Sequence, residues 1–177
     1  RSEKIIEELK SSSEFKRLIR ETKEYKKFIK AQWQKNSEKV LEIIENTSGL
    51  KLPNQCIDVY ITHPKLKNGF TIDNNKIAWG HSEDFLNYST VYLCHELMHI
   101  LTKHDNTDVT HAVIELLIDN ELRIRLNQFG SYFQFQGHKH LAELKEKIFP
   151  EWQKFLKRDK KNIFNFIKEF KSKYMRQ

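Results

Sequence analysis

The sequence HELMH at residues 95–99 lies within a stretch, residues 85–102, whose apolar positions recur at helical spacing. Histidines four residues apart lie one turn apart on the same helix face, so His95 and His99 can both reach one metal ion at about 2.0 to 2.1 Å. Glu96 lies beside His99 and can face a water molecule on the metal instead of the metal itself. The segment therefore predicts a helix with two zinc ligands and a general base.

A catalytic zinc site needs a third protein ligand and an open fourth position. The best candidates are Glu115 and Asp119, the acids of ELLID, which share a face of a strongly apolar helix expected over residues 108–127. Because a buried carboxylate requires a partner, we expect one acid to bind zinc and the other to accept a hydrogen bond from a ligand histidine. Two alternatives stay open, namely Asp105 as the ligand, or a pair of acids on a solvated face beside nearby arginines.

The succession of HELMH and ELLID resembles the gluzincin zinc metallopeptidases, including their smallest single-domain members. The resemblance covers residues 55–128. It implies His95 and His99 as zinc ligands, Glu96 as general base, Glu115 as third ligand and Asp119 as the partner of a histidine. Certain other small HExxH families take an aspartate from a comparable helix as the third ligand, so Asp119 remains an alternative to Glu115.

The same resemblance implies hydrolysis of a peptide bond in a peptide or protein substrate, with Glu96 taking a proton from water and passing it to the leaving amine. An extended substrate would pair with residues 76–80, by analogy with the gluzincin sheet. The negative charge that develops on the substrate also needs a hydrogen-bond donor. The candidate donors are Tyr132, His138 and His140, with Tyr88 and Tyr92 as weaker alternatives.

Apolar periodicity predicts helices before this core and strands at its start. Residues 1–48 have helical spacing, with a new helix beginning at the Ser11 to Glu14 capping pattern, a third capped by Asn36 or Ser37, and an end at Gly49. Three short strands follow, and they are expected to form a mostly antiparallel sheet. The strands are residues 57–61, 69–71 and 76–79, the last two joined by a turn at 73–75.

Length and composition indicate one α+β domain of zincin-like fold over residues 1–177. It would comprise N-terminal helices (1–48), a catalytic core (55–128) and a C-terminal helical region (131–177) interrupted at Pro150. In the core, the small sheet would pack on the active-site helix and on the glutamate helix. A hydrophobic content of 38% with 12% aromatic residues supplies a real core and excludes a disordered chain.

The formal net charge of +7 allows an acidic partner, so the alternative to a peptidase is a non-catalytic zincin-like module that holds nucleic acid or an acidic protein. No nucleic-acid-binding motif supports that alternative. Two cysteines outside any CxxC pair favour a reduced, cytoplasmic setting, although a removed signal peptide stays compatible with the sequence. No apolar run is long enough to predict a transmembrane segment.

Overall fold

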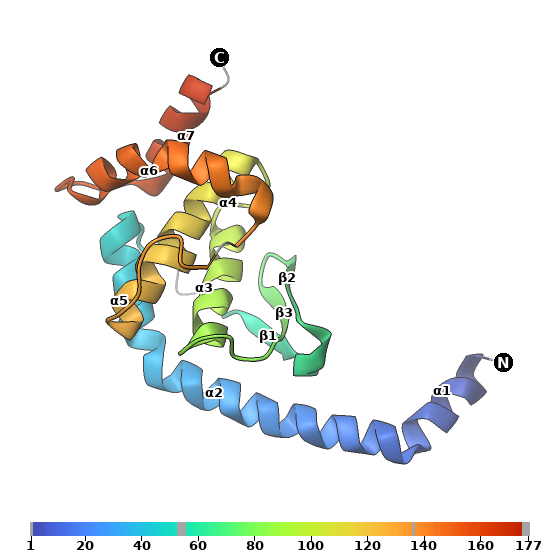
Figure 1. Cartoon of the computed structure of the whole chain (residues 1–177). Helices are drawn as coiled ribbons and strands as arrows, with labels where there is room; N and C mark the ends of the chain where they lie inside the picture. The colour runs from blue at the N-terminus through green and yellow to red at the C-terminus, as the bar shows by residue number, and fades with distance from the viewer. Residues whose placement is uncertain (1, 53–55, 136, 175–177) are drawn as a thin grey trace.

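Helix α3 (Tyr88–Leu101) separates a small β-sheet on one side from a long helix on the other (Figure 1). The computed structural model describes residues 2–52, 56–135 and 137–174. The long helix consists of three consecutive segments, α4 (Asp108–Ile114), η2 (Glu115–Leu122) and α5 (Arg123–Asn127). The predicted α+β class is confirmed, and so is a continuous helical run over residues 108–127.

The sheet is mixed, so the expectation of a mostly antiparallel sheet was wrong. Strand β1 (Asp58–Ile61) pairs in parallel with β3 (Lys76–Gly80), and β2 (Asn68–Asp73) pairs with β3 as the predicted antiparallel hairpin. The chain passes from β1 through the short η1 helix (Pro64–Leu66) to the edge strand β2, and only then returns to the centre. The centre suits β3 because its apolar residues are buried on both faces, whereas β2 carries polar and exposed side chains.

The N-terminal region forms two helices, α1 (Ser2–Ser11) and α2 (Ser13–Ser48), where three were expected. Ser12, rather than Ser11, caps α2 by accepting a hydrogen bond from the Phe15 amide at 3.1 Å. Helix α2 then continues unbroken through Asn36, whose side chain is buried and donates to the Gln32 carbonyl and to Asn87. Gly49 ends α2 in the left-handed conformation, as predicted.

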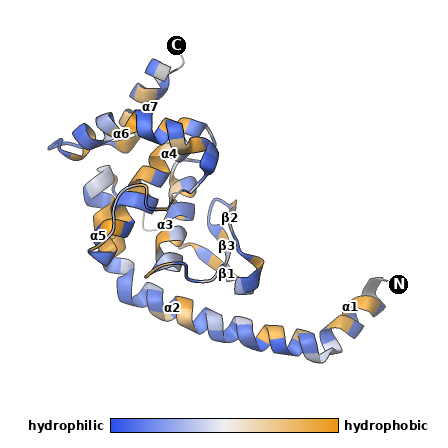
Figure 2. Cartoon of the chain, in the orientation of Figure 1, coloured by the Kyte–Doolittle hydropathy of each residue, from blue (hydrophilic) through white to orange (hydrophobic). Residues whose placement is uncertain are grey.

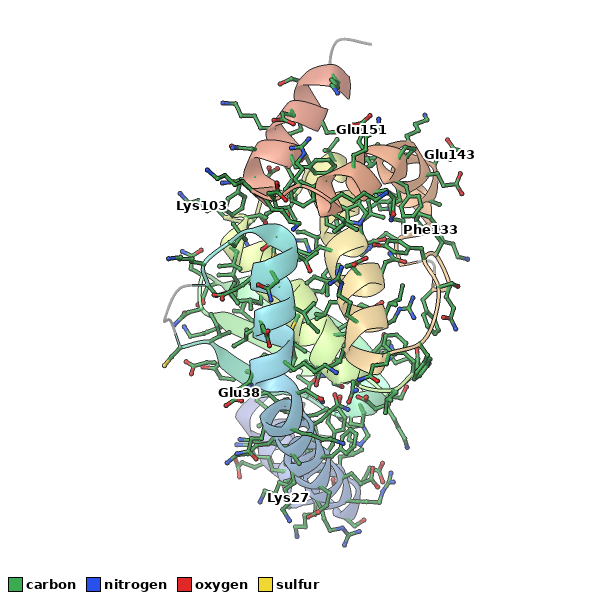
Figure 3. All side chains as sticks on the ribbon, turned by 90° about the vertical axis from the view of Figure 1, so that its left-hand side faces the viewer. Lys27, Glu38, Lys103, Phe133, Glu143 and Glu151 are labelled. Atoms are coloured by element: carbon green, nitrogen blue, oxygen red, sulfur yellow. The ribbon has the colours of Figure 1, made fainter. Side chains whose placement is uncertain are left out.

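Helix α1 and the first turns of α2 extend away from the remaining structure (Figure 1), and their surface is mostly hydrophilic with separate hydrophobic positions (Figure 2). From Glu21 onward α2 contacts the rest of the protein, since the Glu21 carboxylate lies 3.0 Å from Nε2 of His63 and the Tyr25 hydroxyl donates to the His81 carbonyl. The C-terminal half of α2 runs beside η2 and α5 (Figure 3). Val40 and Ile44 of this half are completely buried there. Within the described ranges, no helix combines the length and the apolar character that crossing a lipid bilayer requires.

The C-terminal region contains the short η3 (Lys139–Leu141) followed by α6 (Ala142–Leu156) and α7 (Ile163–Tyr174). The predicted interruption at Pro150 was wrong, because α6 continues through this residue and ends only at Leu156. Proline removes one backbone hydrogen bond from a helix. Here the completely buried Ile148, Trp152 and Phe155 on either side of it anchor α6 to the core, and this packing outweighs the lost bond.

Candidate metal centre

Helix α3 carries both histidines of the HELMH motif on the side that faces α4 and η2, since His95 contacts Asp119 of η2 and both histidines contact His111 of α4. His95 is 3% exposed and Glu96 is 8% exposed, whereas His99 is half-buried. The Nε2 atoms of His95 and His99 lie 3.2 Å apart. The i, i+4 spacing therefore brings the two imidazoles together as the sequence predicted.

The third side chain at this point is His111 of α4. Its Nε2 lies 3.3 Å from Nε2 of His95, and the ring nitrogens of His95, His99 and His111 form one cluster. Glu115 belongs to a different cluster, with His111 and His138. The structure thus differs from the prediction for the third ligand, since it places His111, and not Glu115, beside the HExxH histidines.

The spacing of the three nitrogens suits a tetrahedral zinc ion. Two nitrogens that each lie about 2.0 to 2.1 Å from zinc at a tetrahedral angle are about 3.3 to 3.4 Å apart. The observed separations from His95 Nε2 are 3.2 and 3.3 Å. Nδ1 of His99, on the other side of its ring, is buried without a hydrogen-bond partner among the described residues. The residues present therefore fit a three-histidine zinc site.

The surroundings set the protonation of the three rings. Burial opposes the charged form of His95, but the Asp119 carboxylate, whose Oδ1 lies 2.9 Å from Nδ1, raises the pKa of His95 to about 9. Burial, reinforced by the neighbouring histidines, lowers the pKa of His99 to about 3 and that of His111 to about 4. His99 and His111 are therefore neutral near pH 7, the form in which imidazole binds a metal, and His95 has to release a proton when a metal binds.

Asp119 is in the position predicted for the partner of a ligand histidine. Its hydrogen bond to His95 Nδ1 is buried, since both side chains are less than 8% exposed. A carboxylate on Nδ1 fixes the tautomer and directs Nε2 toward the cluster. The predicted hydrogen bond between Asp119 and a histidine of the motif is therefore confirmed. Asp119 contacts Nδ1 of His95, on the side of the ring opposite to the Nε2 that faces His99 and His111.

A π-helical segment brings Asp119 and His111 to the same side. In an α-helix each residue turns about 100°, so two residues eight positions apart would differ in direction by about 80°. The segment η2 begins at Glu115 and is π-helical, and a π-helix turns less per residue. The reduced rotation realigns Asp119 with His111, so that both contact His95, while Glu115 between them points elsewhere.

Glu115 points toward α6, where it forms a buried ion pair with Lys145. Glu115 is 0% exposed and Lys145 is 2% exposed. The Glu115 carboxylate also accepts hydrogen bonds from the backbone amide of His138 at 3.0 Å and from its Nδ1 at 2.7 Å. Burial favours the neutral acid, but these donors hold the pKa of Glu115 below its ordinary value. The hydrogen bonds and the ion pair of Glu115 thus hold the segment that follows α5, at His138, and helix α6, at Lys145.

Gly137 shows how closely this chain passes over Glu115. Gly137 has a φ of +54°, and a Cβ built on it would lie 2.5 Å from the Glu115 carboxylate. Only glycine accommodates both the left-handed backbone and this approach. As a result, His138 stacks edge-on against His111, with ring centroids 4.3 Å apart, at the rim of the histidine cluster.

Replacing Lys145 with Met should lower the free energy of unfolding by about 3 kcal/mol, because it leaves the buried Glu115 carboxylate without its cationic partner. Urea unfolding of the metal-free protein at pH 7 measures the change. The matched control is the double variant E115Q/K145M, in which no charge remains unpaired. It should recover most of the loss, and equal destabilisation of the single and double variants would contradict the explanation.

Glu96 connects α3 to the sheet. The Thr71 hydroxyl of β2 donates a hydrogen bond to Glu96 Oε2 at 2.9 Å. The predicted pairing of substrate with β3 was wrong, because β1 and β2 occupy both edges of that strand. Strand β2 is the edge on the side of Glu96, with Phe70 and Ile72 half exposed.

The predicted hydrogen-bond donors to substrate differ in their positions. His138 lies at the cluster, whereas His140 is exposed and lies 4.0 Å from Asp108. Tyr132 is engaged by Glu121 and by the Trp152 indole, and not by any histidine of the cluster. The ring of Tyr92 stacks on His95, with centroids 5.8 Å apart, and the ring of Tyr88 contacts that of Tyr92 at a tilt.

Asp105, the other alternative ligand, bonds to Lys171, Thr107 and Thr110. It thus lies at the junction of α4 and α7, outside the histidine cluster.

His111 is the site residue that sequence reasoning missed. Its signal was present, since His111 precedes Glu115 by four residues and Asp119 by eight on one continuous helix. Comparison of the chain with protein-family models, with curated proteins and with solved structures gives no match. The case for a function therefore rests on the geometry of this centre.

Proposed function

We propose that this protein is a zinc-dependent metallopeptidase in which His95, His99 and His111 hold the metal and Glu96 is the general base. The observation that carries the proposal is that the Nε2 atoms of His99 and His111 lie 3.2 and 3.3 Å from Nε2 of His95. A glutamate follows the first of these histidines in the sequence, on the same helix. Three ligands leave the fourth position open for chemistry.

Zinc bound by the three histidines would polarise a peptide carbonyl group and make a coordinated water more acidic. Glu96 would accept the proton of the attacking water and deliver it to the leaving nitrogen. The Thr71 hydroxyl holds one carboxylate oxygen of Glu96 and leaves the other for this transfer. Asp119 would keep His95 oriented through Nδ1.

The free edge of β2 is the surface best suited to an extended substrate. A peptide that adds to this edge would run past Thr71 and hence past the base Glu96, with its side chains beside Phe70 and Ile72. His138 is the donor best placed at the rim of the centre to contact a substrate carbonyl. The proposed substrate is accordingly a peptide or an extended segment of a protein.

A third histidine would distinguish this chain from the gluzincins, whose third ligand is a glutamate. The resemblance in HELMH and ELLID then reflects the shared HExxH helix, while Glu115 serves the fold through Lys145. The classification we propose is a zincin-like peptidase with three histidine ligands, and it requires a ligand test that separates His111 from Glu115.

Removing the metal should abolish hydrolysis. We expect zinc-loaded protein to cleave a fluorogenic peptide library, to lose this activity after dialysis against a chelator, and to regain it with one equivalent of zinc, because neither the water nor the carbonyl is activated otherwise. Zinc content and cleavage rate are measured on the same samples.

Activity that persists in fully metal-free protein would contradict the proposal. Protein that retains one zinc but cleaves no member of the library, nor unfolded protein substrates, would favour the alternative of a non-catalytic module. The salt dependence of binding to DNA or RNA would then be the next measurement, since phosphate contacts weaken steeply with salt.

A further inference from the structure

A cavity of about 610 Å³ lies between α2, the sheet and α3. Aliphatic and aromatic side chains from all three elements line it, among them Trp33 of α2, Val59 of β1, Ile77 of β3 and Leu97 of α3. The volume is within the range of about 300 to 1,000 Å³ that is typical of small-molecule sites. The residues that line it are distinct from the histidine cluster and from Glu96.

Among the residues that the structure describes, two charged side chains line the cavity, and both are positive. Lys26 and Lys30 lie one turn apart on α2, and no acidic residue is among the lining residues. Neither lysine forms an ion pair or a hydrogen bond within the described part of the chain. Lys27, on another face of the same turn, is by contrast paired with Glu24 at 2.8 Å.

The chemistry of the lining selects the kind of occupant. Apart from the two lysines and the indole of Trp33, the lining side chains cannot form hydrogen bonds, and none of them offers an acceptor. The amide N–H groups of a peptide would remain unpaired against these side chains, which is unfavourable. A hydrocarbon chain has no such groups and would remove the apolar walls from water.

The two lysines favour a negative head group at the rim. Like charges at i, i+4 repel each other, and a carboxylate between Lys26 and Lys30 would relieve this repulsion. We propose that the cavity binds a long-chain fatty carboxylate, with its chain between the sheet and α3 and its head group at Lys26 and Lys30. The site adjoins the face of α3 that carries Leu97, and it does not depend on zinc or on peptidase activity.

Dodecanoate is a suitable probe because it is soluble below micelle formation. We expect isothermal titration to give one bound dodecanoate per chain and no saturable binding of dodecyltrimethylammonium, which has the same chain and the opposite charge. Charge reversal in K26E/K30E should weaken dodecanoate binding at least about tenfold. The matched control K23E/K27E reverses two lysines on the same helix outside the cavity and should bind within about twofold of the wild type.

A second variant tests the cavity itself. Val59→Trp places an indole in the space proposed for the chain and should abolish binding, while circular dichroism verifies that the variant is folded. Absence of saturable binding to the wild type, or equal affinities of wild type, K26E/K30E and V59W, would overturn the proposal. So would binding to anionic vesicles that K26E/K30E and K23E/K27E weaken equally, because that result would indicate a general basic surface.

Discussion

The variant Glu96→Gln should retain one zinc per chain and lose about 10² to 10⁴-fold in kcat/KM for a cleaved peptide. Glutamine keeps the size of the side chain and can still accept the hydrogen bond from Thr71. It can no longer take a proton from water or return one to the leaving amine. Steady-state kinetics and metal analysis of the same preparation measure both quantities.

Thr71→Val provides the control for this experiment. It removes the hydrogen bond at 2.9 Å to Glu96 but leaves the carboxylate in place, so we expect a loss of about tenfold or less. Full activity of zinc-loaded Glu96→Gln would refute the assignment of Glu96 as the base. A loss of zinc in that variant would instead show that Glu96 supports the metal.

The variant His111→Ala should lose the zinc that the wild type retains, with a decrease of at least about 10²-fold in affinity, because two histidines remain where three are needed. Mass spectrometry of untagged protein, purified without metal resin, measures the metal content. A chelator competition assay then gives the affinity for each variant.

The comparison variant is E115Q/K145M, which removes the carboxylate favoured by the gluzincin resemblance without leaving Lys145 unpaired. It should bind zinc as the wild type does, within about threefold in affinity. The reverse pattern, with zinc lost in E115Q/K145M and kept in His111→Ala, would restore Glu115 as the third ligand and refute the three-histidine site.

Prediction from sequence succeeded where the determining interactions are local. The pairing of His95 with His99 requires only that HELMH be helical, because i, i+4 spacing then fixes the geometry. The turn between β2 and β3 follows from Asp73 and the two asparagines after it, and the end of α2 from Gly49. A carboxylate on ELLID as the hydrogen-bond partner of a histidine of HELMH was also predictable, since a buried acid requires such a partner.

The sequence alone did not show which side chain of the helix over residues 108–127 lies beside the HExxH histidines. Glu115 and Asp119 were ranked as ligands on the assumption that 108–127 is a regular α-helix. The π-helical segment that begins at Glu115 changes which faces align. Glu115 then forms a buried ion pair with Lys145, which is 30 residues away along the chain. As a result, His111 and not Glu115 lies beside His95.

By itself, the sequence determined an α+β protein with a helix that carries two histidines one turn apart and a glutamate beside them, because hydrophobic period and residue spacing are local properties. Only the tertiary structure decided which third histidine lies beside them, that β1 and β2 form the edges of the sheet, and where a lysine-rimmed apolar cavity opens. These features depend on the packing of α3 between the sheet and the α4–η2–α5 helix. Packing brings together residues that are far apart in the sequence, and no local sequence pattern predicts such contacts.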